Sequence, residues 1–242
     1  MGYVKEQASK EFERWSETYD QCVLQWLLFG PSHRVLIGRI RALMGNARFR
    51  LLDVGCGTGV FAARVREEFA RSEVWGVDLV ASMLSKGRHR WNGPAGRAIP
   101  VQGDSERLPF ATGSFDLVTS SNSFHHYPRQ DVAIQEMRRV LRPGGRLLII
   151  DGYRDGPWGW FIYDFCVASI EGEVHHASAR RFRELMAQAG FQAIAQRVHR
   201  GPAPFLLSEG IAGESAAGIP SPHFHLRDMG RGEFLAQDAT AE

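Results

Sequence analysis

Cysteine is scarce in this chain of 242 residues, which carries only Cys22, Cys56 and Cys166. These three lie far apart, so they form neither a C-x-x-C metal pair nor the dense disulfide framework that small secreted domains need. Such sparse cysteine is typical of a reducing compartment. We therefore expect a cytoplasmic protein.

Long apolar runs and a dominant charge are also missing. No apolar run approaches the roughly 20 residues that cross a bilayer, and the charged start fits neither a secretory signal nor an N-myristoylation site, where Glu6 replaces the required Ser or Thr. The 29 Lys and Arg nearly balance 27 Asp and Glu, for a formal net charge of +2. We expect no membrane span and no nucleic-acid partner.

The chain has ample apolar residues, 44% of the total, which suffices for one large α/β domain. Short apolar runs alternate with helical patterns between residues 50 and 151, and this alternation predicts a parallel sheet with right-handed crossovers. The predicted strands are Leu51 to Val54, Val74 to Val77, Ile99 to Gln102, Phe115 to Thr119, and Leu147 to Ile150.

The flanking segments predict additions to this sheet. Residues 1–45 form a helical cap of two helices broken at Gly30-Pro31, and residues 46–209 form the core. Within the core, Ser178 to Ala189 is helical, and Phe191 to Val198 with Ala203 to Leu207 forms a hairpin that closes the sheet. Residues 210–242 are rich in Gly, Ala, Pro and Ser, which predicts a mobile extension.

The most informative segment runs from Leu51 to Ala62 and contains the loop Asp53-Val54-Gly55-Cys56-Gly57-Thr58-Gly59. A strand that enters a helix through a glycine turn allows a nucleotide-like ligand to lie on the backbone beside the helix N-terminus. The spacing is G-x-G-x-G rather than the dinucleotide fingerprint G-x-G-x-x-G. Asp53 also places negative charge where a diphosphate would sit, which favours a cationic cofactor.

Two further carboxylates end the next strands. Asp78 follows the second strand and could accept hydrogen bonds from both ribose hydroxyls, whereas the alternative is a solvated strand-end or capping aspartate. Asp104 and Ser105 follow the third strand and could contact the exocyclic amine of a purine. Their alternative is an ordinary Asx turn after Gly103.

Taken together, these blocks resemble class I S-adenosylmethionine-dependent methyltransferases, in the broad group that includes the ubiquinone/menaquinone C-methyltransferases. The matching segments run through the whole core: Leu51 to Ala62, Val77 to Leu84, Gln102 to Phe110, Ser114 to Pro128 and Arg138 to Asp151. The resemblance implies a Rossmann-like seven-stranded, mostly parallel sheet of order 3-2-1-4-5-7-6, with strand 7 antiparallel and helices on both faces. It also implies S-adenosyl-L-methionine as cofactor.

The resemblance further implies a role for each site residue. Gly55 and Gly57 let the methionine end lie on the backbone, Asp53 orients its amino group, and Leu79 packs on the adenine. The other residues so implied are Asp78 for ribose, Asp104 and Ser105 for the adenine amine, Ser120 and Asn122 beside the methyl-transfer side, and Tyr19 as a helix tyrosine closing over the cofactor.

Methyl transfer from a sulfonium depends mainly on alignment, but a phenol or carbon acid must also lose a proton. His125 and His126 follow the fourth strand and are candidate general bases; the alternative is that they serve packing and the turn. An aromatic-rich insert at about residues 153–177 predicts either a lid for a partly apolar, small-molecule acceptor or a core helix. We expect no metal, because His175-His176 and His223-x-His225 have no carboxylate or cysteine ligands at regular spacing.

Two other functions are compatible with parts of the pattern. A nicotinamide-dependent reductase would use a similar strand, turn and helix, but the third glycine comes one residue early and Asp53 faces the phosphate region. A regulatory or assembly protein could keep the cofactor pocket without an acceptor site. The leading prediction is methyl transfer to oxygen, carbon, nitrogen or sulfur of a small acceptor.

Overall fold

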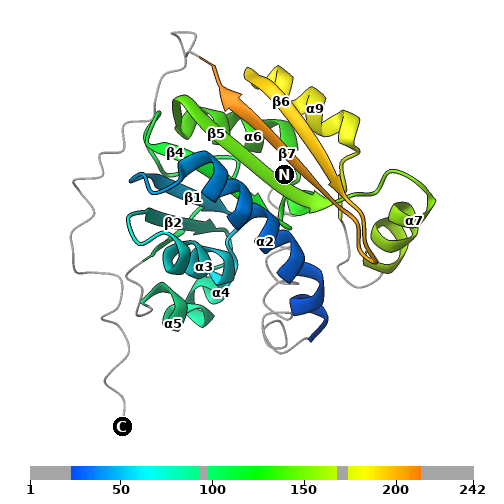
Figure 1. The fold of residues 1–242 in the computed structure, drawn as a ribbon, viewed down its shortest axis with the longest axis horizontal. Coiled ribbons are helices and arrows are strands. Elements are labelled where there is room, and N and C mark those ends of the chain that lie inside the picture. Colours follow the sequence, from blue (N-terminus) through cyan, green and yellow to red (C-terminus); the bar gives the residue numbers. More distant parts are fainter. Residues whose placement is uncertain (1–22, 93–97, 168–173, 214–242) are drawn as a thin grey trace.

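A computed structural model describes residues 23–92, 98–167 and 174–213. Its centre is a seven-stranded sheet of order β3-β2-β1-β4-β5-β7-β6, which confirms the predicted order (Figure 1). β7 runs antiparallel to both β5 and β6, and the other neighbouring pairs are parallel. The strands are β1 (Arg50–Val54), β2 (Glu73–Asp78), β3 (Ile99–Gln102), β4 (Phe115–Ser121), β5 (Leu141–Gly152), β6 (Phe191–His199) and β7 (Phe205–Ala212).

Helices cover both faces of this sheet (Figure 1). They are α2 (Val23–Met44), α3 (Val60–Glu68), α4 (Ala81–Lys86), α5 (Arg88–Trp91), α6 (Gln130–Val140), α7 (Pro157–Trp160) and α9 (Ala179–Gln188), with the 3₁₀ turn η2 (Phe124–His126) and the π-helical segment η3 (Phe161–Val167). None of these described helices combines the length and apolar character needed to cross a membrane.

The central strands are buried on both sides, so apolar residues run continuously along them. In β1, Leu51 belongs to the core beneath α2 and α3, whereas Leu52 belongs to the core beneath α6 and α9. Both leucines are fully buried. This packing fixes the register of β1 and hence the place where its carboxyl end, and the glycine loop after it, emerges.

The cap differs from the prediction of two helices broken at Gly30-Pro31. Within the described residues, α2 continues through Pro31 up to Met44, although an interior proline costs about 3 kcal/mol. Tertiary packing offsets this cost, because Leu36 and Ile40 are fully buried and the Arg39 guanidinium forms two hydrogen bonds, of 2.6 and 2.8 Å, with the Glu209 carboxylate of β7.

Two other boundaries also differ from expectation. β7 extends to Ala212, so the first residues assigned to a mobile extension from residue 210 are part of the sheet. The fifth strand was predicted to begin at Leu147, but β5 begins at Leu141, and the segment from Arg142 to Gly145 lies inside it as an irregularity in its pairing with β4. Gly144 takes a φ of 75° there.

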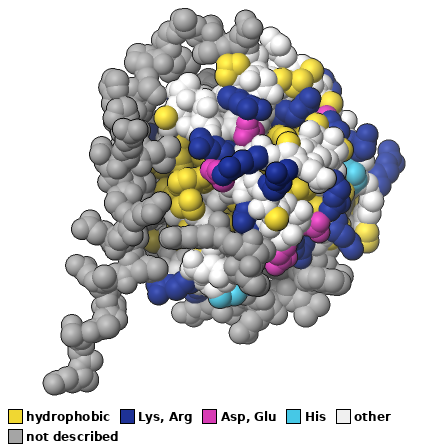
Figure 2. Space-filling model, turned by 60° about the vertical axis from the view of Figure 1, so that its left-hand side comes forward, with side chains coloured by type: hydrophobic (Ala, Val, Ile, Leu, Met, Phe, Trp, Pro, Cys, Tyr) yellow, Lys and Arg dark blue, Asp and Glu magenta, His cyan; other side chains and the backbone are white. Residues whose placement is uncertain are grey.

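One face of the molecule has side chains of mixed charge (Figure 2). On the face shown in Figure 2, basic side chains are interspersed with acidic, apolar and neutral ones rather than joined into one continuous basic stripe.

Candidate functional site

The glycine loop folds over the carboxyl end of β2. The backbone N–H groups of Gly55 and Cys56 both donate to the Val77 carbonyl, at 2.8 and 3.1 Å. The Gly57 N–H donates to Asp78 Oδ2 at 2.8 Å, and the Val80 N–H donates to Asp78 Oδ1 at 2.9 Å. Asp78 is therefore held between the loop and the start of α4, and its carboxylate, which also interacts with the Leu79 N–H, keeps a remaining lone pair for a ligand hydroxyl.

The two loop glycines are required for different reasons. A Cβ on Gly57 would meet only the Met83 methyl at 3.8 Å, so this side of the loop is open to a ligand. A Cβ on Gly55 would lie 2.5 Å from the Ser123 hydroxyl and 2.6 Å from the Tyr127 hydroxyl. The glycine at 55 is thus explained by the protein's own packing, which the sequence did not reveal.

Cys56, between these glycines, has a packing role. A Cβ on Gly76 of β2 would lie 2.8 Å from the Cys56 sulfur, so the thiol fills the space that the glycine leaves. Burial raises the pKa of this thiol well above its ordinary value. A buried, protonated thiol is a poor nucleophile.

Asp53 is a buried acid near the end of β1, with an exposed fraction of 2%. Burial raises its pKa to about 7, against the opposing effect of a 2.9 Å hydrogen bond from the Thr119 hydroxyl, and the negative charge of Asp78 raises it further. A carboxyl group with this pKa gains most from a cationic partner, because such a partner stabilises the ionised form that burial disfavours.

Leu79 and the loop after β3 lie beyond Asp78. Leu79 is 40% exposed, which is unusual for a leucine at the end of a central strand and leaves an apolar surface for a ring. Asp104 accepts a 2.9 Å hydrogen bond from the Glu106 N–H, so the Asx turn considered from the sequence is present. Ser105 is half-buried in this same turn.

The position of this loop depends on charges that sequence reasoning missed. The Glu106 carboxylate, 1% exposed, is paired with the Arg129 guanidinium at 2.5 Å. Arg139 donates to the carbonyls of Leu108 and Phe110, at 3.0 and 2.8 Å. On an amphipathic helix such as α6 the charged Arg139 is easily taken for a solvent-facing residue; only the tertiary structure brings it to the loop.

Two polar residues at the end of β4, Ser120 and Asn122, were predicted to make backbone or side-chain contacts with the cofactor. The Ser120 hydroxyl is buried and interacts with the hydroxyls of Ser123 and Tyr127 at 3.0 and 3.3 Å, so its side chain faces the interior. Asn122, with a φ of 52°, donates from its amide to the Ser32 hydroxyl of α2 at 2.9 Å. Asn122 therefore ties the cap helix to the edge at which the loop emerges.

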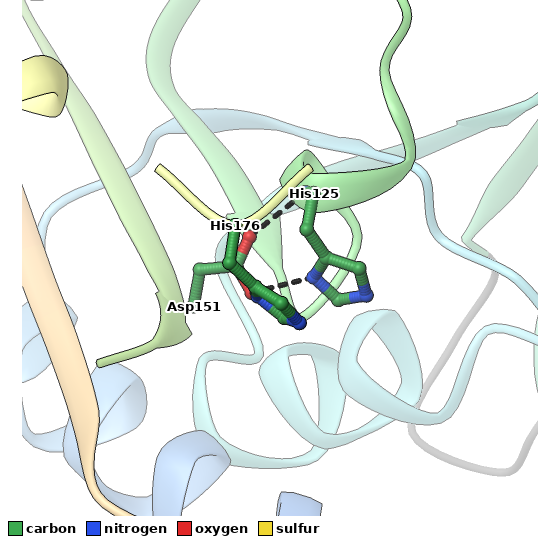
Figure 3. A group of neighbouring side chains, drawn as sticks. All are labelled: His125, Asp151 and His176. Atoms are coloured by element: carbon green, nitrogen blue, oxygen red, sulfur yellow. Dashed lines mark hydrogen bonds and ion pairs between the residues drawn. The ribbon is translucent and has the colours of Figure 1, made fainter. Parts of the chain in front are cut away.

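A buried cluster that the sequence did not reveal joins the ends of β4 and β5. The His125 ring nitrogen Nδ1 lies 2.6 Å from Asp151 Oδ1, and the His125 backbone N–H donates to Asp151 Oδ2 at 2.9 Å. The ring of His176 points toward the same carboxylate (Figure 3), with its Nδ1 at 4.0 Å from Asp151 Oδ1. No carboxylate lies at a regular spacing from His175-His176 in the sequence, but the fold brings Asp151 there from β5.

The protonation of this cluster follows from its surroundings. Burial alone would raise the pKa of Asp151, but the charge and the hydrogen bond of His125 lower it below its ordinary value. Burial lowers the pKa of His176 to about 4, with a further contribution from His125. His126, which is half-buried, has its pKa lowered well below the usual range by burial and by His125.

The aromatic insert does not form the core helix that was the alternative prediction. The described helical part of the insert is α7 and η3. In these segments the large aromatic side chains of Trp158, Trp160, Phe161 and Phe165 are 55%, 53%, 41% and 58% exposed. Phe161 stacks on both Trp158 and Phe165, with ring centroids 5.9 and 5.6 Å apart. Tyr19, expected to close over the cofactor, lies outside the described residues.

The sequence and the fold of this chain resemble those of known methyltransferases. A family described as methyltransferase domain matches residues 52–149. The chain is 31% identical over 223 residues to the ubiquinone/menaquinone biosynthesis C-methyltransferase of Nitrosospira multiformis, covering 78% of this chain and 89% of that protein. It is 29% identical over 242 residues to the protein of that name from Pseudomonas putida, covering 84% and 94%.

Among solved structures, an S-adenosylmethionine-dependent methyltransferase from Thermotoga maritima superposes with a TM-score of 0.67. The match covers 85% of this chain and 99% of that chain. At 19% sequence identity, this likeness concerns the fold.

Proposed function

Because the chain belongs to the class I S-adenosylmethionine-dependent methyltransferases, we propose that it methylates a ring carbon of a small quinol or phenol. The full-length relatives carry names that specify C-methylation in ubiquinone and menaquinone biosynthesis. The observation that carries the proposal on this chain is the buried His125–Asp151 pair, because a carbon acid or phenol has to lose a proton during the transfer.

The residues at the strand ends fit the cofactor. The open side of Gly57 gives it access to the backbone, Asp78 offers lone pairs to the ribose hydroxyls, and exposed Leu79 offers an apolar surface to adenine. Asp53 is suited to the positive charge at the methionine end. Asp104 and Ser105 are proposed to contact the adenine amine, and Ser120 and Asn122 are proposed for the methyl-transfer side.

S-adenosylmethionine supplies a methyl group that is already activated by its sulfonium. The protein's part is to align the acceptor in line with that methyl group and to exclude water, which in well-oriented reactions lowers the barrier by about 7 to 11 kcal/mol. General-base assistance adds about 10²- to 10⁴-fold.

His125 is the proposed base, and Asp151 positions it. An ionised carboxylate can only accept hydrogen bonds, so the 2.6 Å contact requires a proton on His125 Nδ1. In a neutral ring the lone pair is then on Nε2. A base that is oriented by a third group in this way is a recurring catalytic arrangement. His126, whose pKa lies well below neutral, is the weaker of the two predicted candidates.

The acceptor side is proposed to be the aromatic insert. Its exposed, mutually stacked rings offer flat apolar surfaces, which suit an aromatic acceptor. We also propose a cytoplasmic location and a small-molecule rather than nucleic-acid partner. Cys56 and Cys166 are free thiols in the described part of the chain, and the surface in Figure 2 has mixed charge.

The test is formation of S-adenosylhomocysteine with quinols, phenols, amines and thiols, followed by NMR of the product to locate the new methyl group. A ring-carbon methyl is the expected result, and turnover confined to amines or thiols would contradict it. His125→Gln should slow transfer by about 10²- to 10⁴-fold with unchanged cofactor affinity. Asp78→Ala should weaken cofactor binding by about 1 to 3 kcal/mol, because it removes a charged hydrogen-bond partner.

A further inference from the structure

The strongest unexplained feature is the His176 imidazole. Its side chain is 1% exposed, and neither of its ring nitrogens has a hydrogen-bond partner among the described residues. A buried polar group without a partner costs about 1 to 3 kcal/mol. The ring nevertheless points toward Asp151, and one donor atom from each of His125, Asp151 and His176 can be chosen so that all three lie within 4.8 Å of one another.

We propose that His125, Asp151 and His176 bind a single divalent transition-metal ion of the zinc class. Two imidazole nitrogens and one carboxylate oxygen form a donor set that suits Zn²⁺ and its neighbours in the first transition series rather than Mg²⁺ or Ca²⁺, which prefer oxygen ligands. This site goes beyond the proposed methyl transfer, which needs no metal.

The distances fit such an ion after a small adjustment. With metal–ligand bonds of 2.0 to 2.2 Å, tetrahedral donor atoms lie about 3.3 Å apart. Asp151 Oδ1 is 2.6 Å from His125 Nδ1 and 4.0 Å from His176 Nδ1. The first distance therefore has to lengthen by about 0.7 Å, and the second has to shorten by about 0.7 Å. Rotation of the side chains supplies movements of this size without displacing the strands.

The surrounding backbone holds the three ligands in place. The His175 N–H donates to the His125 carbonyl at 2.8 Å, which fixes the segment carrying His176 against η2. The Arg154 guanidinium donates to the His176 carbonyl at 3.2 Å, and the Gly152 N–H donates to Asp151 Oδ1 at 2.8 Å. The Gly152 bond orients the Asp151 carboxylate itself, as outer hydrogen bonds to metal ligands do, whereas the other two fix the backbone that carries the histidines.

Three protein ligands leave a fourth position for water or for an oxygen of a small molecule, as in catalytic zinc sites. The bound metal ion also replaces the proton on His125 Nδ1, which in the metal-free protein is donated in the hydrogen bond to Asp151. The remaining nitrogen of a metal-bound imidazole carries a proton and cannot accept another. This last consequence rests on the proposed function: a metal-bound enzyme cannot use His125 as its base.

The direct test is titration of untagged, metal-stripped protein with Zn²⁺ against a chromophoric chelator. His223 and His225 are replaced by Gln in all samples, so that this second histidine pair does not contribute. We expect one Zn²⁺ per chain, and at least about tenfold weaker binding in His176→Gln and in Asp151→Asn. The matched control is His175→Gln, because His175 is exposed and adjacent in the chain; its affinity should equal that of the starting protein.

The proposal is overturned if no saturable Zn²⁺ binding occurs, or if His176→Gln and His175→Gln bind alike. Circular dichroism of the metal-free proteins shows whether each variant folds. If His176→Gln does not fold, the comparison of Asp151→Asn with His175→Gln decides the question. Methyl transfer with and without Zn²⁺ separates the two proposals. If Zn²⁺ binds and inhibits methyl transfer, both the metal site and the role of His125 as base are supported. If Zn²⁺ binds without inhibiting methyl transfer, the metal site is supported and His125 is not the base.

Discussion

The affinity for S-adenosylmethionine should depend on pH through Asp53. This carboxyl is buried and its pKa is about 7, raised by burial first and also by Asp78. A cationic ligand group beside it favours the ionised form. Below neutral pH, binding must therefore release the proton that Asp53 holds in the free protein, and the free energy of that release weakens binding.

The size of the effect follows from the same pKa. At pH 6 a group with a pKa of about 7 is protonated in a ratio of about ten to one, whereas at pH 7.5 it is mostly ionised. If the bound state keeps Asp53 ionised at both pH values, affinity rises about eightfold from pH 6.0 to pH 7.5. This corresponds to about 1.3 kcal/mol.

The assay is isothermal titration calorimetry at both pH values in two buffers of different ionisation enthalpy, which also counts the protons released. Asp53→Asn is the control, because it keeps the shape of the side chain and cannot ionise. An equal pH dependence in the two proteins would refute the role of Asp53. The amino group of the ligand itself has a pKa of roughly 8, but it contributes equally to both titrations.

The raised pKa of Asp53 also predicts how the stability of the cofactor-free protein depends on pH: stability should fall as pH rises, whereas cofactor affinity should increase. The folded state binds the Asp53 proton more tightly than the unfolded chain, whose pKa is about 4, so this contribution to stability is lost as pH rises from about 4 through about 7. Urea unfolding should show that Asp53→Asn removes this loss. If the wild-type protein instead gained stability relative to Asp53→Asn as the pH rises from about 4 to about 7, the raised pKa of Asp53 would be contradicted.

Three other substitutions have defined outcomes. Gly55→Ala should lower the free energy of unfolding by about 2 to 4 kcal/mol, from overpacking and a φ of 71°, whereas Gly57→Ala should cost about 1 kcal/mol and mainly weaken cofactor binding; urea unfolding and calorimetry separate the two effects. Arg139→Met should destabilise by about 3 to 5 kcal/mol, because it leaves buried groups of the β3 loop unpaired, with the exposed Arg180→Met as a control that should unfold like wild type. Leu79→Ser should weaken cofactor binding about fivefold without changing the urea midpoint, since this side chain is already 40% exposed; a shifted midpoint would mean that Leu79 serves the core.

The main features of the sheet could be predicted from the sequence because β1, β2 and β4 are short apolar runs whose side chains are buried on both faces. The order of the strands came from the resemblance to a known family. The break at Gly30-Pro31 was predicted wrongly, because local preferences do not include the burial of Leu36 and Ile40 that sustains the helix. The end of β7 was missed because Ser208-Glu209-Gly210, directly after the predicted end at Leu207, gives little strand signal.

The site could be predicted only where a single segment carried the signal. Asp53 and Asp78 were found because each ends an apolar run beside or near the glycine loop. The pairing of Asp151 with His125 and His176 joins residues about 25 positions apart in the chain, and no spacing rule connects them. The inward orientation of Ser120 likewise depends on Ser123 and Tyr127, which occupy that space only after η2 has formed.

The crowding at Gly55 has an evolutionary consequence. The hydroxyls of Ser123 and Tyr127 occupy the volume that any larger residue at position 55 would need. Drift at the three positions should accordingly be correlated: a chain that acquires alanine at 55 should first lose bulk at 123 or 127. Selection for revertants of a Gly55→Ala strain would be expected to recover compensating changes at those two sites.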